Sequence, residues 1–289
     1  MDTSLLFVSS TLFWTLSSEQ WFRLAKTYGL GGIEIWAQQL ESNKISAEEV
    51  RRAARYYGLH TTIHNYSWDI NLLSLNRSQR SVAVHLTKKA IELASYLNSL
   101  QVTIHPGKEL FCMPGADYDL LLAESANSLG RFAQGQGTTA SFEIMEKIPK
   151  ERVTSVEAIY RMEAAGNKAI CWKYTEDIAH CDSTEEILHT AAVLNGRISE
   201  FHLSNKKGIQ RHITDMAAGD FNLPEIVKEL SSYNIPFILE GMDISPASSV
   251  FHNALSYLGV EKKHEDKMEK HDSSFNMLCY GNHSFNRLR

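Results

Sequence analysis

The chain has 289 residues, of which 43% are hydrophobic and 22% are charged. This composition is that of a folded globular protein and excludes a chain that is disordered throughout. Lysine and arginine number 29 against 34 aspartates and glutamates, which gives a net charge of −5. No overall positive field would therefore attract DNA or RNA, and we do not expect a nucleic-acid partner.

The cysteines and the start of the chain predict a cytoplasmic protein. The four cysteines are too scattered for a disulfide framework, and no pair has the C-x-x-C spacing of a zinc site. The first residues, MDTSLLFVSSTLFW, lack the basic start and the cleavage site of a signal peptide. No apolar run approaches the roughly 18 residues that a membrane span requires.

Short apolar runs alternate with amphipathic stretches along most of the chain. The runs have strand length and are rich in Ile, Val, Phe and Trp. In chain order they are Leu5–Ser9, Gly32–Trp36, His60–His64, Gln101–His105, Ala140–Ile144, Ala169–Trp172, Glu200–Leu203 and Phe237–Glu240. Two of the intervening helices are predicted to begin with capping boxes, Ser17 with Gln20 and Ser46 with Glu49.

This alternation favours a single (β/α)₈ TIM barrel over residues 1–260. An open doubly wound sheet is the alternative, but its usual glycine-rich phosphate loop is replaced after the first run by Ser9, Ser10 and Thr11. Residues 261–289 are charged, polar and without periodicity. We expect them to form a loose C-terminal tail.

Polar side chains stand at the C-terminal ends of six predicted strands. They are three glutamates and three histidines: Glu34, His64, His105, Glu143, His202 and Glu240. The C-terminal strand ends of such a barrel form one mouth, where the active site lies. Because an unpaired buried carboxylate costs several kcal/mol, this set indicates a functional site rather than packing.

These residue types suit a divalent metal and proton transfer. Carboxylates and imidazoles bind Mn²⁺, Mg²⁺, Co²⁺ or Zn²⁺. Glu143 and Glu240, on two different strands, can also flank a substrate. One carboxylate would remove a proton from the carbon next to a carbonyl group, and the other would return it.

Several segments together resemble one known superfamily, the xylose isomerase-like TIM barrels. They are STLFW at 10–14, HNYSWDINLLS at 64–74, IHPG at 104–107, FEIM at 142–145, FHLSN at 201–205 and ILEG at 238–241. This superfamily includes sugar isomerases and epimerases, inosose dehydratases and endonuclease IV. The resemblance implies that Glu143, His202 and Glu240 are metal ligands and that the two glutamates are the acid–base pair.

The same resemblance gives roles to further residues. His64, His105 and His212 match histidines that endonuclease IV uses to hold three zinc ions. In the sugar isomerases and epimerases, we expect them to contact the substrate. Apart from the resemblance, Trp36 and Trp68 are predicted to stack on a sugar face, with packing at the strand ends as the alternative.

The sixth strand departs from the family pattern, which has an aspartate and, three residues later, a histidine. An ungapped alignment places Lys173 and Glu176 at these positions and predicts that they contact the substrate. Asp177 and His180 have the required spacing and are the alternative, with four residues inserted. A lysine at the metal site would weaken or prevent metal binding because it repels the cation.

The sequence therefore predicts a sugar or sugar phosphate isomerase or epimerase with at most one weakly bound divalent metal ion. Its partner would be a small carbohydrate-like substrate, and the oligomeric state is left open. One alternative is a metal-dependent phosphodiesterase like endonuclease IV, although Gln210 replaces an aspartate expected for a complete three-zinc site. The other alternative is a barrel that has lost its metal and only binds a ligand.

Overall fold

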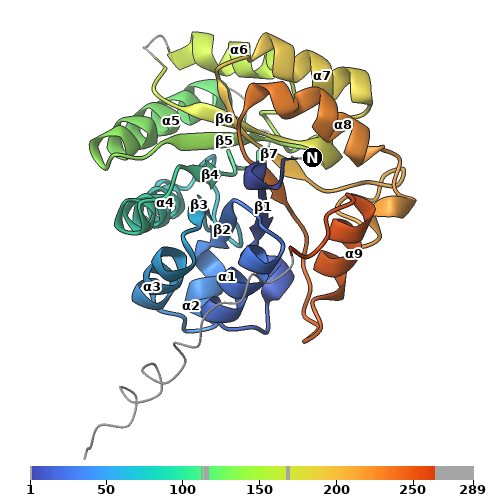
Figure 1. Cartoon of the computed structure of the whole chain (residues 1–289). Coiled ribbons are helices and arrows are strands. Elements are labelled where there is room, and N and C mark those ends of the chain that lie inside the picture. The colour runs from blue at the N-terminus through green and yellow to red at the C-terminus, as the bar shows by residue number, and fades with distance from the viewer. Residues whose placement is uncertain (1, 112, 114–116, 167–169, 264–289) are drawn as a thin grey trace, which may run out of the picture.

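The computed structural model describes residues 2–111, 113, 117–166 and 170–263. Eight parallel strands pair in chain order and close into a barrel, with helices around the outside (Figure 1). The strands are β1 (Leu6–Ser9), β2 (Gly32–Trp36), β3 (His60–His64), β4 (Val102–Ile104), β5 (Ala140–Ile144), β6 (Lys173–Asp177), β7 (Ile198–Leu203) and β8 (Phe237–Leu239). The predicted (β/α)₈ barrel is confirmed.

The described residues contain nine α-helices, because the connection from β2 to β3 holds two. They are α1 (Ser18–Thr27), α2 (Ala37–Ser42), α3 (Ala47–Tyr57), α4 (Arg77–Leu97), α5 (Tyr118–Gly135), α6 (Val156–Gly166), α7 (Thr184–Val193), α8 (Leu223–Leu230) and α9 (Ser249–Tyr257). Both predicted capping boxes are present, at Ser17 before α1 and at Ser46 before α3. Each satisfies backbone N–H groups that the first helical turn leaves without a partner.

The interior of the barrel is polar as well as buried. Thr103 of β4 forms a hydrogen bond with Thr175 of β6, and Ser141 of β5 forms one with Ser199 of β7. Strands that are not neighbours in the sheet can meet in this way only across the inside of the barrel. Ser141 also bonds Thr175, which joins the two pairs into one hydroxyl network. TIM barrels usually fill this space with branched apolar side chains.

The sixth strand lies further along the chain than the sequence indicated. The apolar run Ala169–Trp172 was expected to form it, but β6 begins at Lys173. Its side chains alternate between the two faces of the wall, with Thr175 and Asp177 on the inner one. Because the inner face of this barrel is polar, the strand lacks a continuous apolar run, and the neighbouring hydrophobic segment was mistaken for it.

Two further predictions concern the chain ends and membranes. The tail predicted for residues 261–289 lies outside the described residues from position 264 onward. At its start, the Lys263 backbone N–H donates to the Thr27 carbonyl. Within the described part of the chain, no helix combines the length and apolar character needed to span a bilayer.

Candidate functional site

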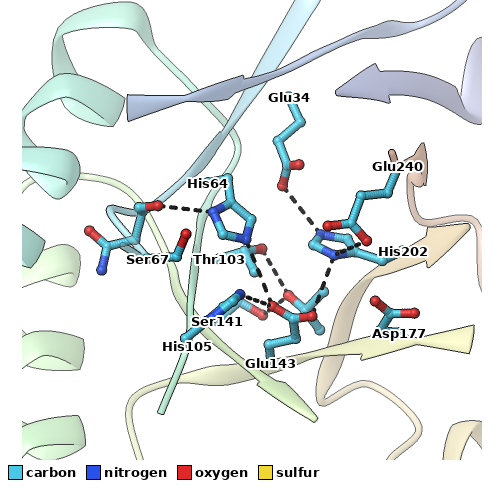
Figure 2. Close-up of polar contacts among 12 residues, drawn as sticks. Glu34, His64, Ser67, Thr103, His105, Ser141, Glu143, Asp177, His202 and Glu240 are labelled. Atoms are coloured by element: carbon cyan, nitrogen blue, oxygen red, sulfur yellow. Dashed lines mark hydrogen bonds and ion pairs between the residues drawn. The ribbon is translucent and has the colours of Figure 1, made fainter. Parts of the chain in front are cut away.

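His202, near the end of β7, is the centre of the polar cluster at the barrel mouth (Figure 2). Its ring is fully buried, and Nδ1 lies 3.4 Å from Glu240 Oε2 and 3.8 Å from Glu143 Oε1. Glu143 comes from β5, and Glu240 directly follows β8. Three residues that the sequence placed at one site are therefore brought together from three strands.

Asp177 is the fourth member of this central group. It is the last residue of β6 and pairs in register with His202, so both side chains lie at the same level of the barrel. Ligand atoms of Asp177, Glu143 and His202 all lie within 4.8 Å of one another. The alternative reading of the strand-6 segment, with Asp177 and His180 at the site, is thus the one that the structure shows.

The predicted substrate contacts of Lys173 and Glu176 are wrong. Lys173 opens β6 at the opposite end of the strand and is exposed. Glu176 is buried, but it lies in register with Ile144, and Cys181 Sγ is 3.9 Å from its Oε1. It therefore points to the outer side of the wall. Weak metal binding was predicted because Lys173 was expected to lie at the metal site. Since Lys173 lies at the other end of β6, that reason no longer applies.

His64 and His105 flank the central group on the side of β3 and β4. His105 Nε2 lies 2.9 Å from Glu143 Oε2, and His64 Nε2 lies 3.8 Å from the same oxygen. The His64 ring is held by its Nδ1, which is 2.9 Å from the Asn65 carbonyl oxygen. Nδ1–H donates to that carbonyl, which directs Nε2 toward the site and Glu143.

His180 and His212 flank the central group on the opposite side. His180 lies in the short 3₁₀ helix Ile178–His180 that follows β6, and its Nδ1 is 2.9 Å from the Ile144 carbonyl oxygen. Its Nε2 is 3.5 Å from Asp177 Oδ2 and 3.3 Å from His212 Nε2. The only sequence signal for His180 was its D-x-x-H spacing from Asp177, and this signal correctly indicated a position at the site.

Two carboxylates lie one layer deeper, beneath the mouth. Glu34 was expected at the mouth, but it is fully buried, and its Oε1 is 3.3 Å from His202 Nε2. Glu200, also fully buried, is 3.5 Å from the same nitrogen and accepts a hydrogen bond from Thr103. The sequence analysis gave Glu200 no role. Its position two residues before His202, on the same face of a strand, was the available signal.

A cavity of about 320 Å³ opens above the central group. Its lining includes five residues predicted for the site: Trp36, His64, His105, His212 and Glu240. The Trp68 ring lies 4.7 Å from that of Trp36 and is 46% exposed, beside lining residue Ser67. The volume is at the lower end of the range of small-molecule pockets, which run from about 300 to 1,000 Å³.

The buried acids and bases shift one another's pKa values. Burial alone would raise the pKa of Glu143, but His105, His64 and His202 outweigh it and hold that pKa well below its usual range. Burial opposes charging of His64 and His180 too, yet nearby carboxylates raise the pKa of each to about 9. Burial raises the pKa of Asp177 to about 6. At neutral pH the metal-free protein therefore has His64 and His180 mainly as imidazolium ions beside the Glu143 carboxylate.

The residues fit a divalent metal ion. Asp177 Oδ2, His202 Nδ1 and Glu240 Oε2 are each buried without a hydrogen bond. His202 offers ligand atoms within 4.8 Å of those of Glu143 and Asp177, and its Nδ1 lies 3.4 Å from Glu240 Oε2. Buried polar atoms are normally hydrogen-bonded, so three such atoms on His202 and the residues beside it indicate a missing partner. Carboxylate oxygen and imidazole nitrogen are ligands that Mn²⁺, Co²⁺ and Zn²⁺ accept. A cation at the group formed by Glu143, Asp177 and His202 would supply such a partner.

Comparisons with known proteins agree with this fold. A D-tagatose 3-epimerase-like protein has a TM-score of 0.72 at 20% identity, covering 88% of this chain and 97% of that one. The 3-keto-D-glucoside 4-epimerase YcjR from E. coli has a TM-score of 0.69 at 15% identity, covering 88% and 98%. A xylose isomerase domain containing protein from Salmonella typhimurium has a TM-score of 0.69 at 17% identity, covering 89% and 98%.

Similarity at these identities shows a shared fold. No curated protein matches this chain in sequence. The family described as xylose isomerase-like TIM barrel matches residues 22–258, which is most of the chain and contains the described site except for Ser9 and Thr11 at the cavity wall. The chain therefore belongs to the xylose isomerase-like TIM barrel family.

Proposed function

We propose that this protein is an isomerase or epimerase that moves a proton at the carbon next to the carbonyl group of a small sugar or sugar phosphate. The observation that carries the proposal is the placement of Glu143 and Glu240. Glu143 comes from β5 and Glu240 directly follows β8, yet both lie within 4 Å of His202 Nδ1, beside a cavity that Glu240 lines. The epimerase names of two proteins with this fold support the same reaction class.

Four residues would hold the metal ion: Glu143, Asp177, His202 and Glu240. When bound, a divalent cation supplies Lewis-acid stabilisation of the negative charge that develops on the substrate's carbonyl oxygen. Three of these four residues were predicted as ligands from the sequence, and Asp177 completes the set.

The two glutamates would carry out the proton transfer. One carboxylate oxygen takes the proton from the C–H bond, whose electron pair moves toward the carbonyl oxygen to form an enediolate. The other glutamate, as the carboxylic acid, gives its proton to the opposite face of that carbon, which inverts it. In an isomerisation the proton goes to the neighbouring carbon, and the hydroxyl proton of the enediolate moves to the former carbonyl oxygen. Exchange of the two carboxyl groups with solvent then restores the starting protonation. The lowered pKa of Glu143 favours the carboxylate that a base requires.

The residues around the cavity would bind and orient the sugar. His64, His105 and His212 reach its wall and can bond hydroxyl groups. Trp36 and Trp68 lie together at one side and offer an apolar surface to a sugar face. Such contacts hold the reacting C–H bond toward a glutamate, and this placement is a large part of enzymatic rate enhancement.

The test is hydrogen exchange. Metal-loaded protein is incubated in D₂O with a panel of ketoses, aldoses and their phosphates, and the products are analysed by NMR. We expect deuterium at the carbon next to the carbonyl of at least one substrate, and turnover slowed by about 10²-fold or more in Glu143→Gln and Glu240→Gln. Absence of exchange across the whole panel, with metal bound, would contradict the proposal.

A second candidate function, a metal-dependent phosphodiesterase, is favoured by the residues on both sides of the central group. His64, His105 and Glu143 form one possible ligand group, and Asp177, His180 and His212 form another. Two or more adjacent metal ions suit phosphodiester cleavage, because they stabilise both the attacking and the leaving oxygen. The Gln210 backbone pairs with Lys207, and its side chain is exposed, so the substituted position adds no ligand.

The two functions predict opposite outcomes in one pair of assays. A phosphodiesterase would cut DNA at abasic sites, with a rate that falls steeply with salt, and would exchange no C–H proton. The negative net charge of −5 counts against a DNA substrate. Cleavage that is lost in His64→Ala or His105→Ala, without any sugar exchange, would establish the second function and exclude the first.

A further inference from the structure

The two ring nitrogens of His202 face different layers of the barrel. Nδ1 faces the mouth, toward Glu143 and Glu240. Nε2 faces the interior, where Glu34 Oε1 lies at 3.3 Å and Glu200 Oε1 at 3.5 Å. Figure 2 shows Glu34 reaching from β2 to the side of the ring opposite Glu143. The proposed catalysis gives neither interior carboxylate a role.

The two interior carboxylates differ in what else they contact. Glu200 accepts a hydrogen bond from Thr103, whose hydroxyl also bonds Thr175 in the interior network. Glu34 has no such donor among the described residues: both of its oxygens are buried without a hydrogen-bond partner. A buried carboxylate without a donor carries a desolvation cost that a nearby N–H group would relieve. The His202 ring is the group positioned to do so.

We infer that Glu34 is a positioning residue for His202: its carboxylate accepts a hydrogen bond from Nε2–H and so fixes the tautomer in which the Nδ1 lone pair faces Glu143 and Glu240. The inference rests on the proposed function, because that lone pair serves there as a metal ligand. A carboxylate behind a metal-binding histidine orients its ring and makes the ligating nitrogen more basic.

Glu200 provides a matched control. Glu34→Gln and Glu200→Gln each remove one negative charge at almost the same distance from His202 Nε2. Both metal-free variants are first checked for folding by thermal unfolding, and Co²⁺ is then titrated into each. We expect Glu34→Gln to weaken Co²⁺ binding by about 10- to 100-fold, the usual effect of losing such a partner, and Glu200→Gln to weaken it less. Equal losses would mean that charge alone matters and would overturn the role of Glu34.

A spectroscopic readout separates positioning from a general structural effect. In the zinc-loaded protein with ¹⁵N-labelled histidine, we expect His202 to carry its proton on Nε2 and the metal on Nδ1. The Nε2–H signal should shift in Glu34→Gln and stay in place in Glu200→Gln. A proton on Nδ1, or an unshifted signal in Glu34→Gln, contradicts the inference.

The same measurements distinguish this inference from the function on which it rests. Wild-type protein that binds neither Co²⁺ nor Zn²⁺ would overturn the proposed metal site and the role of Glu34 together. Normal metal binding in Glu34→Gln, with wild-type binding also intact, would overturn only the role of Glu34.

Discussion

The two histidine pairs beside His202 are built alike but connected differently. Each pair has one buried ring, His64 or His180, whose Nδ1 lies 2.9 Å from a backbone carbonyl oxygen. Each has one partly exposed ring, with 32% of the His105 side chain and 35% of the His212 side chain accessible. The rings within a pair are 5.0 and 5.2 Å apart and nearly perpendicular. Two histidine pairs of similar geometry thus lie on either side of His202.

The difference lies in which group each exposed histidine meets. His105 contacts a carboxylate directly, with 2.9 Å between Nε2 and Glu143 Oε2. His212 Nε2 instead faces His180 Nε2 at 3.3 Å, while its Nδ1 bonds the Ser204 hydroxyl at 2.9 Å. The first pair thus contacts Glu143, one of the two proposed acid–base residues. The second pair lies further from the carboxylates of the centre, with 3.5 Å between His180 Nε2 and Asp177 Oδ2 and 3.6 Å between His212 Nδ1 and Glu240 Oε2.

The largest loss of metal affinity is expected from changes to Glu143 and Asp177, the carboxylates that contact the two histidine pairs. Glu143→Gln and Asp177→Asn should each weaken Mn²⁺ binding by more than about 100-fold, beyond the loss of a supporting partner, because each removes a ligand. Isothermal titration measures this effect. Glu176→Gln, which changes a buried carboxyl on the other face of β6, is the control. Wild-type affinity in Asp177→Asn would remove that residue from the metal site.

Alanine variants of the two exposed histidines sharpen the comparison between the pairs. If both bind substrate, His105→Ala and His212→Ala should each lower kcat/KM by about tenfold, the effect of one lost hydrogen bond of about 1.4 kcal/mol. The number of metal ions per chain should remain one, as measured by elemental analysis. Three ions in the wild type, with one lost in each variant, would instead favour the phosphodiesterase.

The buried histidines predict how stability depends on pH. Metal-free, His64 and His180 have pKa values of about 9 against an ordinary value of 6.5. A raised histidine pKa contributes stability that is complete below the unfolded value and is lost as the pH rises through the folded one. The Tm of the metal-free protein should therefore fall between pH 6.5 and 9. His64→Gln and His180→Gln should each flatten this dependence by a similar amount, whereas unequal effects would show that the pairs are not energetically alike.

The smallest change in metal affinity is expected from substitution of Lys173. Had this residue stood at the metal site, Lys173→Asp would create a ligand and strengthen metal binding. Because Lys173 is exposed at the other end of β6, we expect the Mn²⁺ affinity to stay within about twofold of the wild type, as charges exposed to water are weakly coupled over distance. A clear rise in affinity would restore the ungapped alignment of this segment.

Much of the fold was predictable because its signals are local. Alternating apolar runs and amphipathic helices gave the (β/α)₈ barrel, and the capping boxes at Ser17 and Ser46 follow from residues three positions apart. The strand ends carrying His64, Glu143 and His202 were found because each follows a large apolar residue, Ile63, Phe142 or Phe201, near the end of a strand. Polar residues at such positions are conspicuous, since burial without a partner is costly.

What the sequence could not decide depends on contacts between distant strands. The position of β6 is set by its pairing with β5 and β7, which brings Asp177 level with His202 and leaves Lys173 at the far end. The depth of Glu34 follows from the closure of the barrel, which turns its carboxylate toward a histidine five strands away in the sequence. An apolar run marks a strand clearly only where its inward face is apolar. Here that face is lined by hydroxyls and carboxylates, several of which form hydrogen bonds with one another across the barrel. Local sequence determined which residues are polar, and only the closed barrel determined which of them meet.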